Sequence, residues 1–326
     1  MLCVFYSSNF KPAWWLKNPH GQTMFAKLLQ DKSSAVEFNE TLELPDGDFT
    51  ELSWTESPEQ APEKPIVVIL HGLEGSQNSH YAKGMLKAIK SSGYIGVLMH
   101  FRGCGSQPNR QARSYHSGDT RDITYFTREL VQRYPTASLA LIGFSLGGNV
   151  AVQYLAQQPD NPYKAACIIC APLDLASCSK KINRGASKIY QKYLLGMLKN
   201  STLKKHQLQP IANICPLKVK SINTMWQFDD YVTAPLNGFI NAEDYYQQVS
   251  GIKVLAEIKQ PCLIIHAQDD PFLDHEKIIA TPPLPNNITF EISQYGGHVG
   301  FIAGNNPFKP SFWLETRVPE YLTKHL

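Results

Sequence analysis

The chain has 326 residues, of which 43% are hydrophobic and 18% are charged, and its formal net charge is +3. This length and composition allow a large buried core, and they favour one α/β domain (residues 1–326) with an insertion over two independent domains. The charge balance gives no indication of nucleic-acid binding, and no run approaches the roughly 18 consecutive apolar residues of a membrane span. We therefore expect a cytoplasmic protein without an integral membrane segment.

The first 35 residues are rich in aromatic side chains and lead into a short helical pattern. They lack the basic region and the cleavage site of a signal peptide. We interpret His20 and Thr23 as local capping and turn residues, and we favour this over a contact with substrate. Residues 40–56 alternate on either side of Pro45-Asp-Gly-Asp48, which predicts an antiparallel hairpin at the edge of a sheet.

From Ile66 onward, strand and helix patterns alternate, which indicates a doubly wound, mostly parallel sheet. Polar residues around Ser117 and Asp119 suit the cap of one helix, and Pro319 interrupts an amphipathic helix at the C-terminus that should pack on the sheet. The patterns predict strands at 66–70, 95–100, 139–144, 164–171, 261–266 and 288–292, and helices at 81–91, 118–133, 149–157 and 312–326.

The segment 172–258 interrupts this alternation with helical patterns rich in Tyr, Leu and Lys. An insertion at this place predicts a cap or lid over the carboxyl ends of the strands, where open α/β sheets bind ligands. Its aromatic residues, Trp226 and Phe228 among them, either line an acyl or aryl pocket or form a small core of the lid itself. If they line the pocket, they should set the preference for acyl chain length.

Seven cysteines are scattered along the chain, at positions 3, 104, 167, 170, 178, 215 and 262. Their odd number and irregular spacing indicate reduced thiols and no disulfide framework. Cys167 and Cys170 have the spacing of a metal or redox pair, but they lie in a strand-like run. Because residues three apart on a strand point to opposite faces, we interpret both as buried strand cysteines.

The segment 139–150 reads LALIGFSLGGNV, an apolar strand that runs into the G-x-S-x-G pattern of a nucleophile elbow. A nucleophile at this turn leaves the strand and enters a helix within one residue. Side chains at the flanking positions would collide, so glycine stands at Gly143 and Gly147. The pattern predicts that Ser145 is a catalytic nucleophile.

A serine nucleophile needs a base that takes its proton and an acid that orients the base. His298 follows the last predicted strand, and Asp269 and Asp270 follow the strand before it, so the chain order is that of α/β-hydrolases. We choose Asp270, because the acid of the common pattern comes three residues after the small residue that ends the strand. Asp269 should accept hydrogen bonds from backbone N–H groups in the turn.

The oxyanion hole should use two backbone N–H groups. One belongs to Leu146, directly after the nucleophile, and the other to Leu73, in the loop after the strand 66–70. Gly72 lets this loop approach the substrate, and His71 is expected to brace the loop and to take no part in the chemistry.

Together these motifs resemble the AB hydrolase 4 family of α/β-hydrolases, which includes bacterial YheT-type esterases and eukaryotic esterases and alcohol acyltransferases. The resemblance implies a carboxylic ester hydrolase with Ser145, Asp270 and His298 as its triad, and it leaves the substrate open. It rests on eight motifs in order: NPHGQTMF (18–25), LPDGDF (44–49), LHGLEGS (70–76), HFRGCG (100–105), YHSGDT (115–120), GFSLGGN (143–149), HAQDDPF (266–272) and GGHVGF (296–301).

We therefore predict a serine carboxylesterase that hydrolyses short- to medium-chain acyl esters of small molecules through an acyl-enzyme, without a cofactor or metal. An alcohol O-acyltransferase or a lipase-like enzyme is the first alternative, since an alcohol can replace water in the second step. A non-catalytic acyl-binding protein on the same fold is a second alternative. A metal-dependent hydrolase is the weakest, because Asp269, Asp270 and His298 lack a convincing set of further ligands.

Overall fold

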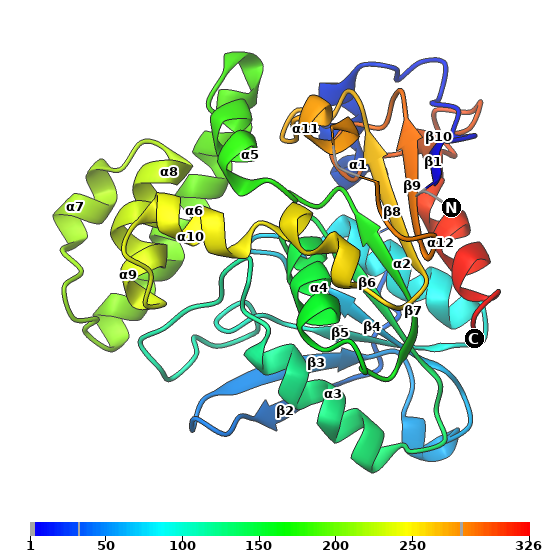
Figure 1. Cartoon of the computed structure of the whole chain (residues 1–326), viewed down its shortest axis with the longest axis horizontal. Coiled ribbons are helices and arrows are strands. Elements are labelled where there is room, and N and C mark those ends of the chain that lie inside the picture. The colour runs from blue at the N-terminus through cyan, green and yellow to red at the C-terminus, as the bar shows by residue number, and fades with distance from the viewer. Residues whose placement is uncertain (1–3, 32, 281–282) are drawn as a thin grey trace.

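The computed structural model describes residues 4–31, 33–280 and 283–326 (Figure 1). Among them, a nine-stranded sheet has the order β1-β9-β8-β7-β6-β4-β5-β3-β2. A second, two-stranded sheet pairs β10 (Ile302–Ala303) with β11 (Ser311–Phe312). The strands of the large sheet are β1 (Val4–Ser7), β2 (Phe38–Glu43), β3 (Phe49–Trp54), β4 (Ile66–Leu70), β5 (Ile95–Met99), β6 (Leu139–Phe144), β7 (Tyr163–Ile169), β8 (Cys262–Ala267) and β9 (Ile288–Ser293).

The predicted fold class is confirmed, because the strands from β1 to β5 along the sheet pair in parallel. The antiparallel hairpin of β2 and β3 forms the edge beside β5, as expected. Strand β1 was not expected. It pairs in parallel with β9 at the other edge, so the N-terminal segment is part of the sheet.

Helices cover both faces of the sheet, because the side chains of each buried strand alternate between two cores. On β4, Ile66, Val68 and Leu70 point into one core, which α3 and α4 cover, and Val67 and Ile69 point into the other, which α2 and α12 cover. The helices outside the segment 172–258 are α1 (Pro19–Leu29), η1 (Pro58–Gln60), α2 (His80–Ser91), α3 (Arg121–Arg133), α4 (Leu146–Gln157), α11 (His275–Ile279) and α12 (Leu314–Leu322).

The segment 172–258 is helical and lies between β7 and β8 in the chain, at the left of Figure 1. Two small apolar clusters of its own hold it together, one around Val219 and one around Tyr245. We call it the helical segment. It contains α5 (Leu175–Ile182), η2 (Gly185–Ser187), α6 (Lys188–Leu208), α7 (Pro216–Ser221), α8 (Met225–Phe228), the π-helix η3 (Asp229–Thr233), α9 (Ala234–Leu236), α10 (Ala242–Val249), η4 (Gly251–Lys253) and η5 (Leu255–Glu257).

Two predicted helix starts were wrong by three residues. Helix α3 begins at Arg121 and not at residue 118, with Thr120 at its N-cap position. Asp119 does not cap this helix, because its carboxylate accepts hydrogen bonds from Arg113 and Arg121. Helix α4 begins at Leu146, three residues earlier than predicted, since the elbow turns directly into the helix.

The interpretation that Cys167 and Cys170 point to opposite faces was also wrong, because both side chains lie in the same core. Cys170 follows the last residue of β7 and has a φ of 49°, which redirects its side chain. The described cysteines are all free thiols, whereas Cys3 lies outside the described residues. No helix of the described chain has the length and apolar character to cross a bilayer.

Buried histidines should make the fold sensitive to acid. Burial lowers the pKa of four rings to between about 3 and about 4, from about 6.5, namely those of His71, His80, His116 and His266. The unfolded chain therefore takes up protons at these rings between pH 6.5 and 4, where the folded chain does not, and stability falls with falling pH. Burial raises the pKa of Asp229 and Asp269 to about 6, which opposes this trend.

We expect the melting temperature to fall between pH 7 and pH 5 in scanning calorimetry. His266 stacks on Phe290, and its buried Nε2 has no partner among the described residues. In the variant His266→Phe the free energy of unfolding should therefore depend less steeply on pH. The slope should fall by about 1.4 kcal/mol per pH unit, which corresponds to one proton. A melting temperature that is flat or rises toward pH 5 would contradict this account.

Candidate active site

Ser145 stands at a sharp turn between β6 and α4. Its backbone has φ 50° and ψ −121°, a conformation that costs a non-glycine residue about 1–3 kcal/mol and that the surrounding structure must hold. The Ser145 N–H donates to the carbonyl of Ile169 on β7, and its own carbonyl accepts from Gly148 in the first turn of α4. The serine side chain therefore projects away from both β6 and α4.

The flanking glycines are required by close backbone approach. A Cβ at Gly143 would lie 2.6 Å from the carbonyl oxygen of Gly147, and a Cβ at Gly147 would lie 2.4 Å from that of His71. The first turn of α4 therefore packs directly against the end of β4. This contact brings the loop after β4 to the nucleophile, where a Cβ at Gly72 would lie 3.2 Å from the Ser145 Cβ.

His298 links Ser145 to Asp270. Its Nε2 lies 2.9 Å from the Ser145 Oγ, and its Nδ1 lies 2.8 Å from the Asp270 Oδ2. The Asp270 side chain is fully buried, and its Oδ1 accepts the N–H of Phe272 at 2.7 Å. The structure thus brings together the three side chains that the sequence selected, from the loops after β6, β8 and β9.

The two neighbouring carboxylates have different partners. Asp269 accepts the N–H of Gly297, the residue directly before His298, at 2.9 Å. Burial raises the pKa of the Asp269 carboxyl to about 6. Of these two carboxylates, only Asp270 bonds to the imidazole ring. Asp269 therefore holds the backbone of the histidine loop, in the role expected for it.

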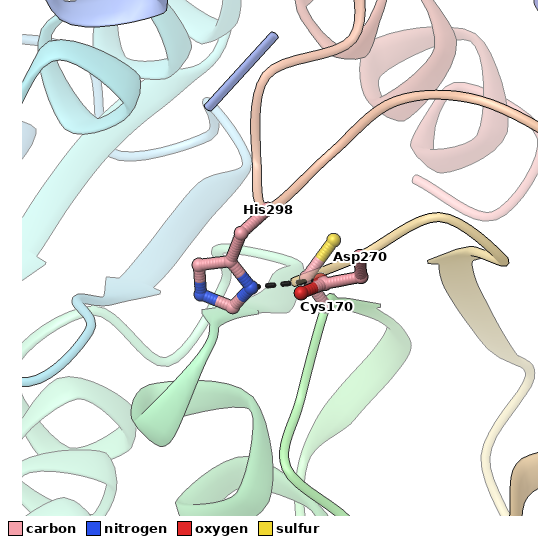
Figure 2. A group of neighbouring side chains, drawn as sticks. All are labelled: Cys170, Asp270 and His298. Atoms are coloured by element: carbon pink, nitrogen blue, oxygen red, sulfur yellow. Dashed lines mark hydrogen bonds and ion pairs between the residues drawn. The ribbon is translucent and has the colours of Figure 1, made fainter. Parts of the chain in front are cut away.

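Cys170 is the third side chain near Asp270 and His298 (Figure 2). One ligand atom of each of the three residues lies within 4.8 Å of the others, a spacing that could admit a metal ion. Burial first, and then the charge of Asp270, raise the pKa of the Cys170 thiol well above its usual range, so the sulfur stays protonated. The His298 Nδ1 and the Asp270 Oδ2 are already bonded to each other, and this set favours a hydrogen-bonded triad over metal ligation.

Distant segments position the histidine. The Thr23 Oγ1 on α1 accepts the N–H of His298 at 2.9 Å and donates to the carbonyl of Pro19. The Phe272 ring stacks on the imidazole, with centroids 4.1 Å apart. Local turn chemistry is therefore only part of the role of Thr23. His20 likewise reaches beyond its own helix, since its Nδ1 lies 3.0 Å from the Tyr190 hydroxyl on α6.

The loop after β4, which carries Leu73, is braced from several sides. The His71 Nδ1 donates to the carbonyl of Gly72, and its Nε2 accepts the N–H of Phe101. Burial lowers the pKa of His71 to about 3, so the ring is neutral and this pattern persists at neutral pH. The Gly72 N–H donates to the Tyr81 hydroxyl at 2.8 Å.

The hydrogen bonds of His71 and Tyr81 orient the backbone of the loop after β4, which faces Ser145. At the other side of the elbow, Leu146 is the first residue of α4, and the first N–H groups of a helix have no acceptor within the helix. Both N–H groups that the sequence selected therefore belong to backbone next to the nucleophile.

A cavity of about 930 Å³ opens in front of Ser145 and His298. The helical segment forms much of its wall, with side chains from α5, α6, α8 and η3. Phe228 lines the cavity, whereas Trp226 packs against Tyr246 within the helical segment, with centroids 5.1 Å apart. Of the two aromatic residues selected from the sequence, only Phe228 is placed to touch a ligand.

Buried polar contacts attach the helical segment to the sheet domain. The Asn149 amide on α4 donates to the carbonyls of Ser117 and Val249 and accepts the N–H of Gly251. The Lys205 Nζ on α6 donates to the Asn109 Oδ1 at 2.7 Å, and burial lowers the pKa of this amine to about 8. Asn149 belongs to the GFSLGGN motif, but no local pattern identified these long-range partners.

Comparison with known proteins gives a consistent assignment. A family model described as "alpha/beta hydrolase fold" matches residues 65–304. The chain is 44% identical to "Putative esterase YheT" of Escherichia coli strain K12 over 322 residues, which cover 98% of this chain and 94% of that protein. It is 31% identical to "Monoacylglycerol lipase" of Saccharomyces cerevisiae over 73% of this chain and 55% of that protein.

Solved structures share the fold at low sequence identity. The esterase Pf2001 of Pyrococcus furiosus superposes with a TM-score of 0.57 at 15% identity, over 99% of both chains. Est1E of Butyrivibrio proteoclasticus, solved with ferulic acid bound, gives a TM-score of 0.56 at 14% identity, over 88% of this chain and 98% of that chain.

The close approach at the elbow predicts unequal effects of two glycine-to-alanine substitutions. Gly147→Ala would place a Cβ within 2.6 Å of backbone atoms of Leu70 and His71, so we expect a loss of about 3 kcal/mol or more, or no folded protein. Gly196 on α6 is the matched control, because its added Cβ would meet nothing within 4 Å. Gly196→Ala should gain about 0.5–1 kcal/mol in urea unfolding. Equal stability of the two variants would contradict the packing described for the elbow.

Proposed function

Because the chain belongs to the AB hydrolase 4 family of α/β-hydrolases and is a hydrolase enzyme, we propose that it is a serine carboxylesterase that forms an acyl-enzyme on Ser145. The observation that carries the proposal is the chain of hydrogen bonds Ser145–His298–Asp270 at the floor of the cavity. Asp270 and His298 act as orienting acid and base.

In the first step the Ser145 Oγ attacks the carbonyl carbon of an ester, and its proton passes to the His298 Nε2. The buried Asp270 carboxylate keeps the other ring proton on Nδ1 and stabilises the imidazolium. The carbonyl oxygen becomes an oxyanion that accepts from the N–H groups of Leu73 and Leu146. Collapse of this intermediate breaks the bond to the alcohol, which leaves with the proton from Nε2.

In the second step water gives a proton to the His298 Nε2 and attacks the acyl carbon, and the Ser145 Oγ leaves with that proton. An alcohol in place of water would make the same step an acyl transfer. The apolar cavity wall supports acyl esters of short to medium chain length as substrates. The relatives named as an esterase and a lipase support the same class.

The helical segment, residues 172–258, serves in this proposal as a lid in a single α/β-hydrolase domain of residues 1–326. Its side chains from α6, α8 and η3 shape the acyl site. Aromatic residues that do not face the cavity hold the lid's own core.

Labelling and kinetics test the proposal together. A fluorophosphonate probe should label the wild-type protein and not Ser145→Ala, and p-nitrophenyl esters from C2 to C12 should be hydrolysed by the wild type only. We expect Ser145→Ala and Asp270→Asn to lower kcat by about 10³-fold or more, because the three residues act as a unit. Ethyl ester formed on addition of ethanol would reveal acyl transfer.

Asp269→Asn is the matched control for Asp270→Asn. It should cost less than about tenfold in kcat, because Asp269 contacts the backbone of the histidine loop and not the ring. The reverse order of the two variants would assign the orienting role to Asp269. More than a tenth of the wild-type rate in Ser145→Ala would remove this serine from the proposed mechanism.

Chain-length preference should depend on Phe228 and not on Trp226. Phe228→Leu changes the cavity wall, so we expect the ratio of C8 to C2 activity to shift by about threefold or more. Trp226→Leu removes a contact with Tyr246 inside the helical segment, so it should lower the melting temperature and leave the ratio unchanged. A ratio that moves equally in both variants would contradict the assignment of Phe228 to the acyl site.

A further inference from the structure

Exposed apolar side chains gather where the cavity opens. Five large hydrophobic residues both line the cavity and face solvent, with exposed fractions from 46% to 70%. We call this set the rim: Met24, Phe25 and Leu28 on α1, and Ile189 and Tyr193 on α6. A monomeric protein rarely exposes contiguous apolar groups beside a cavity unless they meet another apolar surface.

The two helices of the rim are in contact. The His20 ring on α1 is bonded to the Tyr190 hydroxyl on α6, and the Lys27 Nζ lies 5.7 Å from the centre of the Tyr193 ring. Ile189 and Tyr193 are four residues apart, so they share one face of α6. The rim is therefore one continuous surface across α1 and α6.

The α6 part of the rim lies within a strongly basic stretch of the sequence. Residues 175–222 hold ten of the chain's 31 Lys and Arg residues and none of its 28 Asp and Glu residues. Eight of the ten are exposed: Lys180, Lys181, Arg184, Lys188, Lys192, Lys204, Lys218 and Lys220. Lys188 and Lys192 directly precede Ile189 and Tyr193, and Lys27 lies within the α1 part of the rim.

We propose that the rim and its flanking lysines dock the protein on an anionic phospholipid surface, with the cavity opening toward the lipid. Apolar side chains enter the boundary between headgroups and acyl chains, while lysines beside them remain at the anionic headgroups. A nucleic acid would use the positive charge but has no need of exposed aliphatic side chains next to a cavity. Docking does not depend on catalysis, but delivery of a lipid ester to Ser145 through this opening rests on the proposed function.

Vesicle flotation of the full chain tests the docking. We expect the wild type and Ser145→Ala to bind vesicles of phosphatidylcholine with about 30% phosphatidylglycerol, more weakly as salt increases, and to bind pure phosphatidylcholine at least tenfold less tightly. Retained binding by Ser145→Ala keeps docking separate from the esterase proposal. If that variant kept its activity, the proposed mechanism would fail and the docking would stand.

Two rim variants and one control locate the surface. The charge variant Lys27→Gln/Lys188→Gln/Lys192→Gln should lose about fivefold in vesicle affinity per lysine, about a hundredfold in total. The apolar variant Leu28→Ser/Ile189→Ser should also lose at least about tenfold. The control Leu217→Ser/Lys218→Gln/Lys220→Gln has the same residue types on α7, on the far side of the helical segment from α1 (Figure 1), and should stay within about twofold of the wild type.

Three results would overturn the proposal. One is the absence of binding to either kind of vesicle by a protein with normal melting temperature. Another is an equal loss in the α7 control, which would mean diffuse attraction without a defined docking surface. The third is tighter retention on duplex DNA than on anionic vesicles at the same salt, which would assign the basic surface to nucleic acid.

Discussion

The contact between the first turn of α4 and the end of β4 is the constraint on which the site depends. Without side chains at Gly143 and Gly147, the helix can begin one residue after the strand ends and lie against the backbone of Leu70 and His71. This contact holds Ser145 in a backbone conformation that a free chain would avoid. It also brings the loop that carries Leu73 beside the nucleophile, so one packing event places both the serine and the neighbouring N–H groups.

The remaining members of the site reach Ser145 from three other places in the chain. The loop after β8 brings Asp270, the loop after β9 brings His298, and α1 holds the backbone of His298 through Thr23. The loop after β8 also holds the histidine loop, since Asp269 accepts the N–H of Gly297 and the Phe272 ring stacks on the imidazole. The geometry of the histidine is therefore fixed by tertiary contacts, and its hydrogen bond to Asp270 is one part of a larger set.

The sequence predicted what depends on local pattern. The strand runs, the edge hairpin and the elbow are short-range features, and the structure has them at nearly the predicted residues. The structure also brings His298 and Asp270 beside Ser145, and each of them follows a strand in a recognisable turn. The early start of α4 was missed because helical periodicity cannot show a helix that begins inside a glycine-rich turn.

Other features depend on contacts between distant residues. Thr23 lies 275 positions from His298, and Asn149 lies 102 positions from Gly251, so neither pairing leaves a periodic trace. Cys170 was misplaced for a related reason, since its positive φ ends the alternation of β7.

Two kinds of contact hold the helical segment, those within the segment and those that join it to the rest of the chain. Its own clusters around Val219 and Tyr245 form mostly from residues of the segment itself, so they hold its helices together but do not orient it against the sheet. Orientation comes from buried polar pairs, above all Asn149 with Val249 and Gly251, which would cost about 1–3 kcal/mol each if left unsatisfied. On the α1 side the links are the partly buried pair of His20 with Tyr190 and the contact of Lys27 with the Tyr193 ring, and the neighbouring side chains are exposed and apolar. Near the elbow the segment is therefore held by buried polar pairs, whereas its contacts with α1, where the cavity meets solvent, are partly exposed.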